Sequence, residues 1–142
     1  MARQSRRACF VAGHQLGHGD TGIRLVPTLV GAGAFGGSAV VMAACGGSHT
    51  LVVTQDGALW ACGCGRDGRL GLNDEADRHV FERVGAGAFG GARVVAAAAG
   101  DSHSAAVTED GALWTWGFIW NETGNTCFKA MPSMKRRSER RG

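Results

Sequence analysis

The sequence predicts an all-β fold built from about two four-stranded antiparallel blades of an incomplete β-propeller. Two observations support this prediction: a gapless internal repeat at an offset of 54 residues, and several short strand-like segments within each period. Residues 31–63 align onto residues 85–117, and 22 of the 33 positions are identical. The 24 glycines among 142 residues argue against a helical bundle, because an interior glycine costs a helix roughly 0.5–1 kcal/mol relative to alanine. Four short strands in a period of this length describe one propeller blade.

The strand signals within the complete repeat follow one another in a regular order. Short apolar or alternating segments separated by turn residues indicate strands, which we expect at residues 40–45, 49–54, 57–62 and about 80–84. The dipeptide Asp56-Gly57 recurs as Asp110-Gly111, and Asp-Gly supplies the positive φ that a tight hairpin turn demands. We therefore expect residues 38–64 and 92–117 to form matching three-stranded units, with these dipeptides at the tips of their second hairpins.

The repeat also divides the chain into three parts. We expect a basic N-terminal arm at 1–8, repeats over 9–117, and a divergent basic tail at 118–142. The repeats comprise a partial unit at 9–36, a complete unit at 37–90 and a partial unit at 91–117. A propeller needs about 4–8 blades, so we expect the chain to be part of one, as a truncated product, an incomplete gene sequence or a remnant. Uncovered blade faces and edges lead us to expect self-association.

Two stretches carry a family resemblance. Residues 43–53, AACGGSHTLVV, and residues 97–107, AAAGDSHSAAV, share small residues, a glycine, a histidine and then aliphatic residues. This pattern, the Asp-Gly-Ala-Leu-Trp that follows it, and the glycine-rich run at 63–71 resemble the regulator of chromosome condensation repeat. The resemblance implies a seven-bladed propeller in full-length members. The expected structural repeat positions are Gly46, His49, Asp56, Gly57, Trp60, Gly63, Gly100, His103, Asp110, Gly111, Trp114 and Gly117.

Basic charge is concentrated at the two ends of the chain. Residues 1–7 hold three arginines, and residues 129–142 hold six basic residues and one glutamate. The interior, 8–128, has six basic and eleven acidic residues, a net charge of −5, which disfavours a nucleic-acid-binding core. We expect little fixed structure over 1–7 and 129–142 and at most weak nucleic-acid binding through the tail. A nuclear-localisation segment is the functional alternative to a solvated end, with the candidate residues Lys135, Arg136, Arg137, Arg140 and Arg141.

The residue patterns do not predict enzymatic, cofactor or metal chemistry. Three GxGxxG strings begin at Gly31, Gly63 and Gly85, but no helix pattern follows them, so we interpret them as turns rather than nucleotide sites. At the equivalent positions of the next repeat, apolar residues replace the cysteines of the first repeat. This replacement favours reduced cysteines that pack in the core over zinc ligands. His49 and His103 recur in phase and indicate structural hydrogen bonds rather than catalysis.

The sequence therefore predicts a non-enzymatic module that binds a protein partner. Loops on a rigid sheet scaffold often carry binding residues, and the loop at 65–77 offers Arg66, Asp67, Arg69, Asp74 and Glu75. The alternative, implied by the resemblance, is guanine nucleotide exchange on a Ran-type small GTPase with chromatin association. No apolar run reaches the roughly 18 residues of a membrane span, so we expect no membrane partner and an intracellular protein, cytoplasmic or nuclear.

Overall fold

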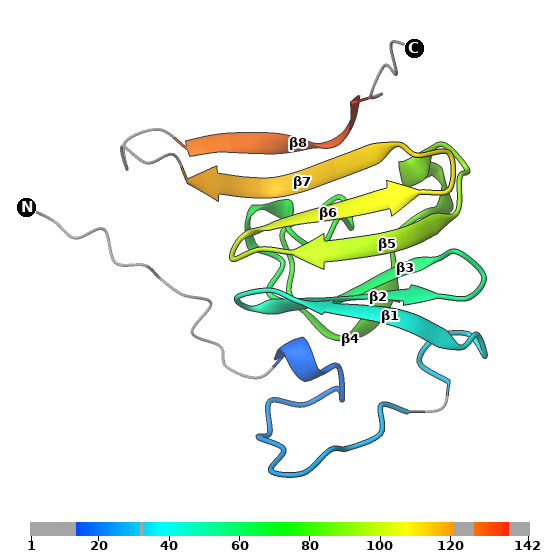
Figure 1. The fold of residues 1–142 in the computed structure, drawn as a ribbon. Helices are drawn as coiled ribbons and strands as arrows, with labels where there is room; N and C mark the ends of the chain where they lie inside the picture. Colours follow the sequence, from blue (N-terminus) through cyan, green and yellow to red (C-terminus); the bar gives the residue numbers. More distant parts are fainter. Residues whose placement is uncertain (1–13, 32, 121–126, 137–142) are drawn as a thin grey trace, which may run out of the picture.

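The computed structural model describes residues 14–31, 33–120 and 127–136, and they form two four-stranded antiparallel sheets (Figure 1). We call the sheet β1-β2-β3-β4 blade 1 and the sheet β5-β6-β7-β8 blade 2. The strands are β1 (Val40–Cys45), β2 (His49–Thr54), β3 (Leu59–Gly63), β4 (Arg78–Arg83), β5 (Val94–Ala99), β6 (His103–Thr108), β7 (Leu113–Trp120) and β8 (Cys127–Arg136). Three short 3₁₀ helices accompany them: η1 (His14–Leu16), η2 (Arg66–Gly68) and η3 (Ala86–Phe89). Within the described ranges, no helix is long and apolar enough to cross a membrane.

The first three strands of the two blades have the same register at the 54-residue offset. Val40 pairs with Thr54 in blade 1, and Val94 pairs with Thr108 in blade 2. Both first hairpins then have an irregularity one residue later, before regular pairing resumes. The second hairpins also correspond, because β2 and β6 each pair with the following strand in equivalent register. The predicted all-β fold and the two matching three-stranded units are confirmed.

The turn chemistry explains why the second hairpins close at the same place. Thr54 Oγ1 donates to Asp56 Oδ1 at 2.5 Å, and the Trp60 indole N–H donates to Thr54 Oγ1 at 3.1 Å. Gly57 takes a φ of 81° in this turn, a value that glycine adopts without a steric penalty. Blade 2 repeats the same contacts with Thr108, Asp110 and Trp114 at 2.6 and 3.1 Å.

Strand β8 corrects one sequence prediction. The composition of residues 129–142 predicted little fixed structure, but Cys127–Arg136 forms a strand along β7. The prediction is wrong for residues 129–136, since backbone N–H and C=O groups at an open sheet edge can pair with a strand of almost any composition. The rest of the predicted unstructured regions, including 1–7, lies outside the described residues.

The main core lies where blade 1 packs against blade 2, and Figure 1 shows the two sheets stacked. Its buried residues come from both blades and from the segment that links them: Leu51, Val53, Leu59, Ala61, Leu70, Val84, Phe89, Val94, Ala97, Ala106, Ala112, Trp114 and Trp116. A smaller cluster of Val52, Cys62 and Phe81 lies in blade 1, with Val30, Phe35 and Trp60 packed against it. The blades therefore share one apolar interface, and burial of its surface supplies the main driving force for their packing.

Candidate interaction site

The loop between β3 and β4, residues 64–77, presents several charged side chains to solvent. Arg66, Asp74 and Glu75 are exposed, and Asp67 is half-buried. Glu75 Oε1 accepts a hydrogen bond from the Asp67 N–H at 3.1 Å, so one exposed side chain braces the loop backbone. Asp67 itself has a φ of 60°, a left-handed conformation that aspartate tolerates better than most residues. The loop is therefore held in a defined conformation.

Arg78, at the start of β4, anchors the far end of this loop. Its guanidinium contacts Asp74 Oδ2 at 2.8 Å and also bonds the Glu82 carboxylate. The hydrogen bond from Arg78, followed by one from the Ala76 N–H, lowers the pKa of the Asp74 carboxyl. Asp74 is consequently ionised at neutral pH and presents a negative charge at the surface.

Arg69 corrects the predicted composition of the partner-binding loop. The residue is only 5% exposed, and its Nη1 donates to Ser48 Oγ at 2.7 Å and to the Asp101 carbonyl at 3.4 Å. Burial lowers the pKa of the Arg69 guanidinium, and the nearby Asp67 carboxylate opposes this shift. Its side chain connects blade 1 with blade 2, so the prediction that Arg69 faces a partner is wrong.

A short chain of hydrogen bonds, which we call the inter-blade joint, links the blades next to Arg69. His49 Nε2 lies 2.8 Å from Ser104 Oγ, and Ser104 donates its own proton to the Arg69 carbonyl at 2.7 Å. The indole N–H of Trp116 donates to the same carbonyl at 2.9 Å. Since the serine proton is already used, His49 Nε2 must be the donor to Ser104 Oγ. The predicted structural role of His49 agrees with this geometry.

The electrostatics of the joint keep the His49 ring neutral. The ring is fully buried, and burial, assisted by the positive charges of Arg69 and His103, lowers its pKa to about 4. Asp101 acts in the opposite direction. Near pH 7 the ring of His49 is therefore neutral and acts as the donor in a chain that runs from His49 through Ser104 to the Arg69 carbonyl.

Part of this joint, the hydroxyl residue and the carbonyl that accepts from it, recurs on the other side of blade 1 at the 54-residue offset. There the Gln15 carbonyl accepts from Thr50 Oγ1 at 2.7 Å and from Cys62 Sγ at 3.5 Å. Gln15, Thr50 and Cys62 precede Arg69, Ser104 and Trp116 by 54 residues each. Sequence reasoning missed this joint, although the hydroxyl residues at positions 50 and 104 were a usable signal.

The three cysteines whose side chains the structure describes differ in their environments. Cys62 is a free, buried thiol, and burial raises its pKa to about 12, whereas Cys45 is free and exposed. Cys64 is buried and disulfide-bonded, so the prediction of reduced packing cysteines is wrong for Cys64. Among the residues that the structure describes, no group of three His, Cys, Asp or Glu side chains is arranged to hold a metal ion.

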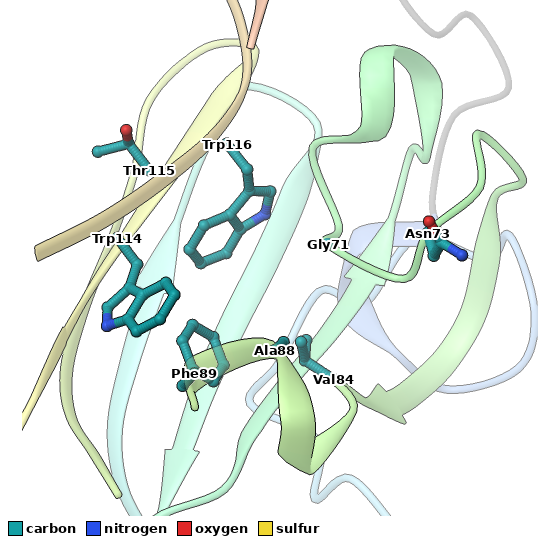
Figure 2. A pocket seen from close by; sticks show the side chains of 8 residues that line it. All are labelled: Gly71, Asn73, Val84, Ala88, Phe89, Trp114, Thr115 and Trp116. Atoms are coloured by element: carbon teal, nitrogen blue, oxygen red, sulfur yellow. The ribbon is translucent and has the colours of Figure 1, made fainter. Parts of the chain in front are cut away.

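A small pocket lies between β7 and the segment that connects β4 to β5, residues 84–93 (Figure 2). Its volume is about 220 Å³, below the roughly 300–1,000 Å³ of typical small-molecule sites. Figure 2 shows the rings of Phe89, Trp114 and Trp116 gathered around it. Phe89 meets Trp114 edge-on at 5.5 Å, and blade 1 repeats this pair with Phe35 and Trp60 at 5.7 Å. The pocket is therefore a packing feature of the repeat.

The structure describes part of the candidate nuclear-localisation tail. Lys135 and Arg136 lie in β8, opposite Trp114 and Leu113 in the register of β7. Arg137, Arg140 and Arg141 lie outside the described residues. The localisation hypothesis therefore stays a prediction, now with its first two residues on a strand.

Two stacked sheets that share the register of their first three strands and repeat the same turn hydrogen bonds and aromatic pair are successive blades of an incomplete β-propeller. A family model, "Regulator of chromosome condensation (RCC1) repeat", matches residues 12–53 and 56–107, and a second model of that description matches 41–69 and 94–125. The chain belongs to the regulator of chromosome condensation repeat family.

Relatives and solved structures agree with this assignment. The chain is 44% identical to the ultraviolet-B receptor UVR8 of Arabidopsis thaliana over 110 residues, which are 78% of this chain and 24% of that protein. It is 38% identical to the mouse regulator of chromosome condensation over 85 residues, 60% of this chain and 20% of that protein. A crystal structure of human WBSCR16 matches with a TM-score of 0.57 and 29% identity, over 70% of this chain and 27% of that chain. The structure of Prp20p from Saccharomyces cerevisiae matches with a TM-score of 0.51 and 27% identity, over 60% of this chain and 21% of that chain. The chain thus spans about a quarter of the length of these proteins.

Proposed function

We propose that the chain is a non-enzymatic repeat module that binds a protein partner through the β3–β4 loop. The observation that carries the proposal is the braced, exposed charge array of this loop, with Arg66, Asp74 and Glu75 at the surface of a rigid blade. A preformed loop loses little conformational entropy when it binds, which favours affinity. Exposed carboxylates at Asp74, Glu75 and Asp77 favour a partner with a basic surface.

The comparisons support this class of function. The structure of Prp20p is described together with its binding properties to Gsp1p and histones, and another structure of that yeast protein contains Kap60. These partners belong to Prp20p, and they suggest purified probes for this chain. Histones fit the proposal best because they are basic.

A direct binding experiment tests the loop. Core histones are titrated against the wild-type chain, the double variant Asp74→Asn/Glu75→Gln, and the control Glu109→Gln, which removes an exposed carboxylate on blade 2. Removing two interfacial charges weakens binding by about tenfold, and the control retains wild-type affinity. Equal affinities for all three proteins contradict the loop as the site, and absence of histone binding by the wild type contradicts the proposed partner class.

Guanine nucleotide exchange on a Ran-type GTPase is the second candidate, favoured by the similarity to Prp20p, whose structure is described with its binding to Gsp1p. Exchange requires only a surface that stabilises the nucleotide-free GTPase. The assay is release of a fluorescent GDP analogue from the GTPase. An acceleration of about tenfold supports exchange, and an unchanged release rate at micromolar chain concentration contradicts it.

A further inference from the structure

Each blade has a face directed toward the next blade in the chain. Equivalent positions on this face differ sharply in exposure between blade 1 and blade 2. Leu59 of blade 1 is 1% exposed because blade 2 covers it, whereas its equivalent Leu113 is 46% exposed. His49 is fully buried, and its equivalent His103 is exposed. Blade 1 uses this face to contact blade 2. The equivalent face of blade 2 is therefore exposed, and we call it the open face.

The opposite side of the molecule presents the complementary face. Val94 of blade 2 is 3% exposed because it packs on blade 1, and its equivalent Val40 is 46% exposed. Ser104 is fully buried in the inter-blade joint, and its equivalent Thr50 is half-buried. Blade 1 therefore presents the face that receives a preceding blade.

The polar groups on these two faces match as well. Thr50 Oγ1 donates to the Gln15 carbonyl, as Ser104 donates to the Arg69 carbonyl, so the Thr50 oxygen keeps lone pairs for another donor. In the inter-blade joint that donor is His49 Nε2, and the equivalent donor on the open face of blade 2 is His103. The chain thus carries both halves of a second joint at its two ends.

The connections between the outer strands add to this complementarity. In blade 1 the β3–β4 loop supplies the Arg69 carbonyl to the next blade. The equivalent carbonyl for blade 1 comes from Gln15, ahead of β1 in the same chain. A second copy that docks its blade 1 on blade 2 of the first copy therefore brings its own Gln15 carbonyl, which accepts from its own Thr50.

We propose that the chain self-associates head to tail, with the open face of blade 2 bound to the Thr50 face of blade 1 in a second copy. The interface repeats the one between the two blades and forms a hydrogen bond from His103 to the second copy's Thr50. Such a heterologous contact generates a closed ring when the rotation closes. Because each copy contributes two blades, closed dimers, trimers and tetramers correspond to four, six and eight blades, within the roughly 4–8 blades of known propellers.

Complementation of two face variants tests this geometry. Leu113→Arg charges the open face of blade 2, and Val40→Arg charges the opposite face of blade 1; both side chains are exposed in the single chain. By sedimentation velocity, the wild type is expected as a discrete multiple of 14.7 kDa, and each variant alone as a monomer. An equimolar mixture of the variants retains one intact interface and forms a 1:1 heterodimer that does not grow further.

Val95→Arg provides the matched control. Val95 is 52% exposed, and its equivalent Val41 remains 60% exposed although blade 2 covers blade 1, so this position lies outside the repeated interface. The control is expected to assemble like the wild type, and circular dichroism checks that all variants fold. A monomeric wild type at about 100 μM, a dimeric Leu113→Arg variant, or failure of the folded variants to pair overturns the proposal. This surface is distinct from the β3–β4 loop, so loss of assembly and loss of histone binding are separable results.

Discussion

Acidification tests whether the inter-blade joint stabilises the folded chain through the neutral ring of His49. Burial, the Arg69 charge and His103 lower the pKa of His49 from 6.5 to about 4. In the unfolded chain the ring takes up a proton near pH 6.5, but in the folded chain only near pH 4. The unfolded state therefore binds more protons between these values, and stability falls as the pH is lowered through this window.

The magnitude follows from the two pKa values. Lowering the pH from about 7.5 to about 5 reduces the free energy of unfolding by about 2 kcal/mol. Above about pH 7.5 the ring is neutral in both states, so the contribution of His49 to stability is fully present and no longer depends on pH. The carboxyl groups with lowered pKa values, Asp20, Asp56 and Asp74, start from 3.8, so their effects fall mainly below this window.

The assay is urea unfolding followed by tryptophan fluorescence at submicromolar concentration, which limits self-association. His49→Gln, which removes the titrating ring, is expected to lose most of the stability change between about pH 7.5 and pH 5. The comparison variant, His103→Gln, removes the equivalent but exposed ring, which is a smaller cause of the His49 shift than burial and the Arg69 charge, so it is expected to lose much less of the pH dependence than His49→Gln. Equal pH dependence in the wild type and in His49→Gln refutes the assignment of the effect to His49.

Three further substitutions probe the inter-blade joint and the end of β3, each by urea unfolding at constant pH. Gly63→Ala lowers the free energy of unfolding by about 3 kcal/mol, because φ is +108° and a Cβ would lie 2.5 Å from the Ser48 carbonyl oxygen. The control Gly85→Ala, where a Cβ would meet nothing within 4 Å, changes the free energy of unfolding by less than about 1 kcal/mol. Equal losses in the two variants contradict the steric reasoning. Arg69→Ala lowers the free energy of unfolding by about 2–3 kcal/mol because it removes buried hydrogen bonds. Arg66→Ala on the same loop changes the free energy of unfolding by less than about 0.5 kcal/mol. A larger loss for Arg66→Ala than for Arg69→Ala is inconsistent with the burial of Arg69. Ser104→Ala leaves the His49 N–H without its acceptor and costs about 1–3 kcal/mol, so an unchanged midpoint rules out a stabilising bond.

The sequence alone predicted the first three strands of each blade, the fourth strand of blade 1 and the second-hairpin turns of both blades. Each of these features depends on contacts among residues close together in the chain, such as the bond from Thr54 to Asp56. The exact 54-residue offset then extended the local prediction from one blade to the other. The role of His49 as a structural hydrogen-bonding residue was also predictable, because its recurrence as His103 disfavoured a unique catalytic position.

The burial of individual charged loop residues and the atoms that join the blades depend on how segments far apart in the chain pack together. Arg69 lies in a loop of mixed charge and resembles its exposed neighbour Arg66 in sequence, yet the packing of blade 2 buries it. The acceptor in each joint is a backbone carbonyl, of Gln15 or Arg69, and every residue type carries the same carbonyl group. Strand β8 likewise depends on main-chain pairing with β7, which requires no particular side chains. These features arise from contacts between segments far apart in the chain, so side-chain composition gives no local signal for them.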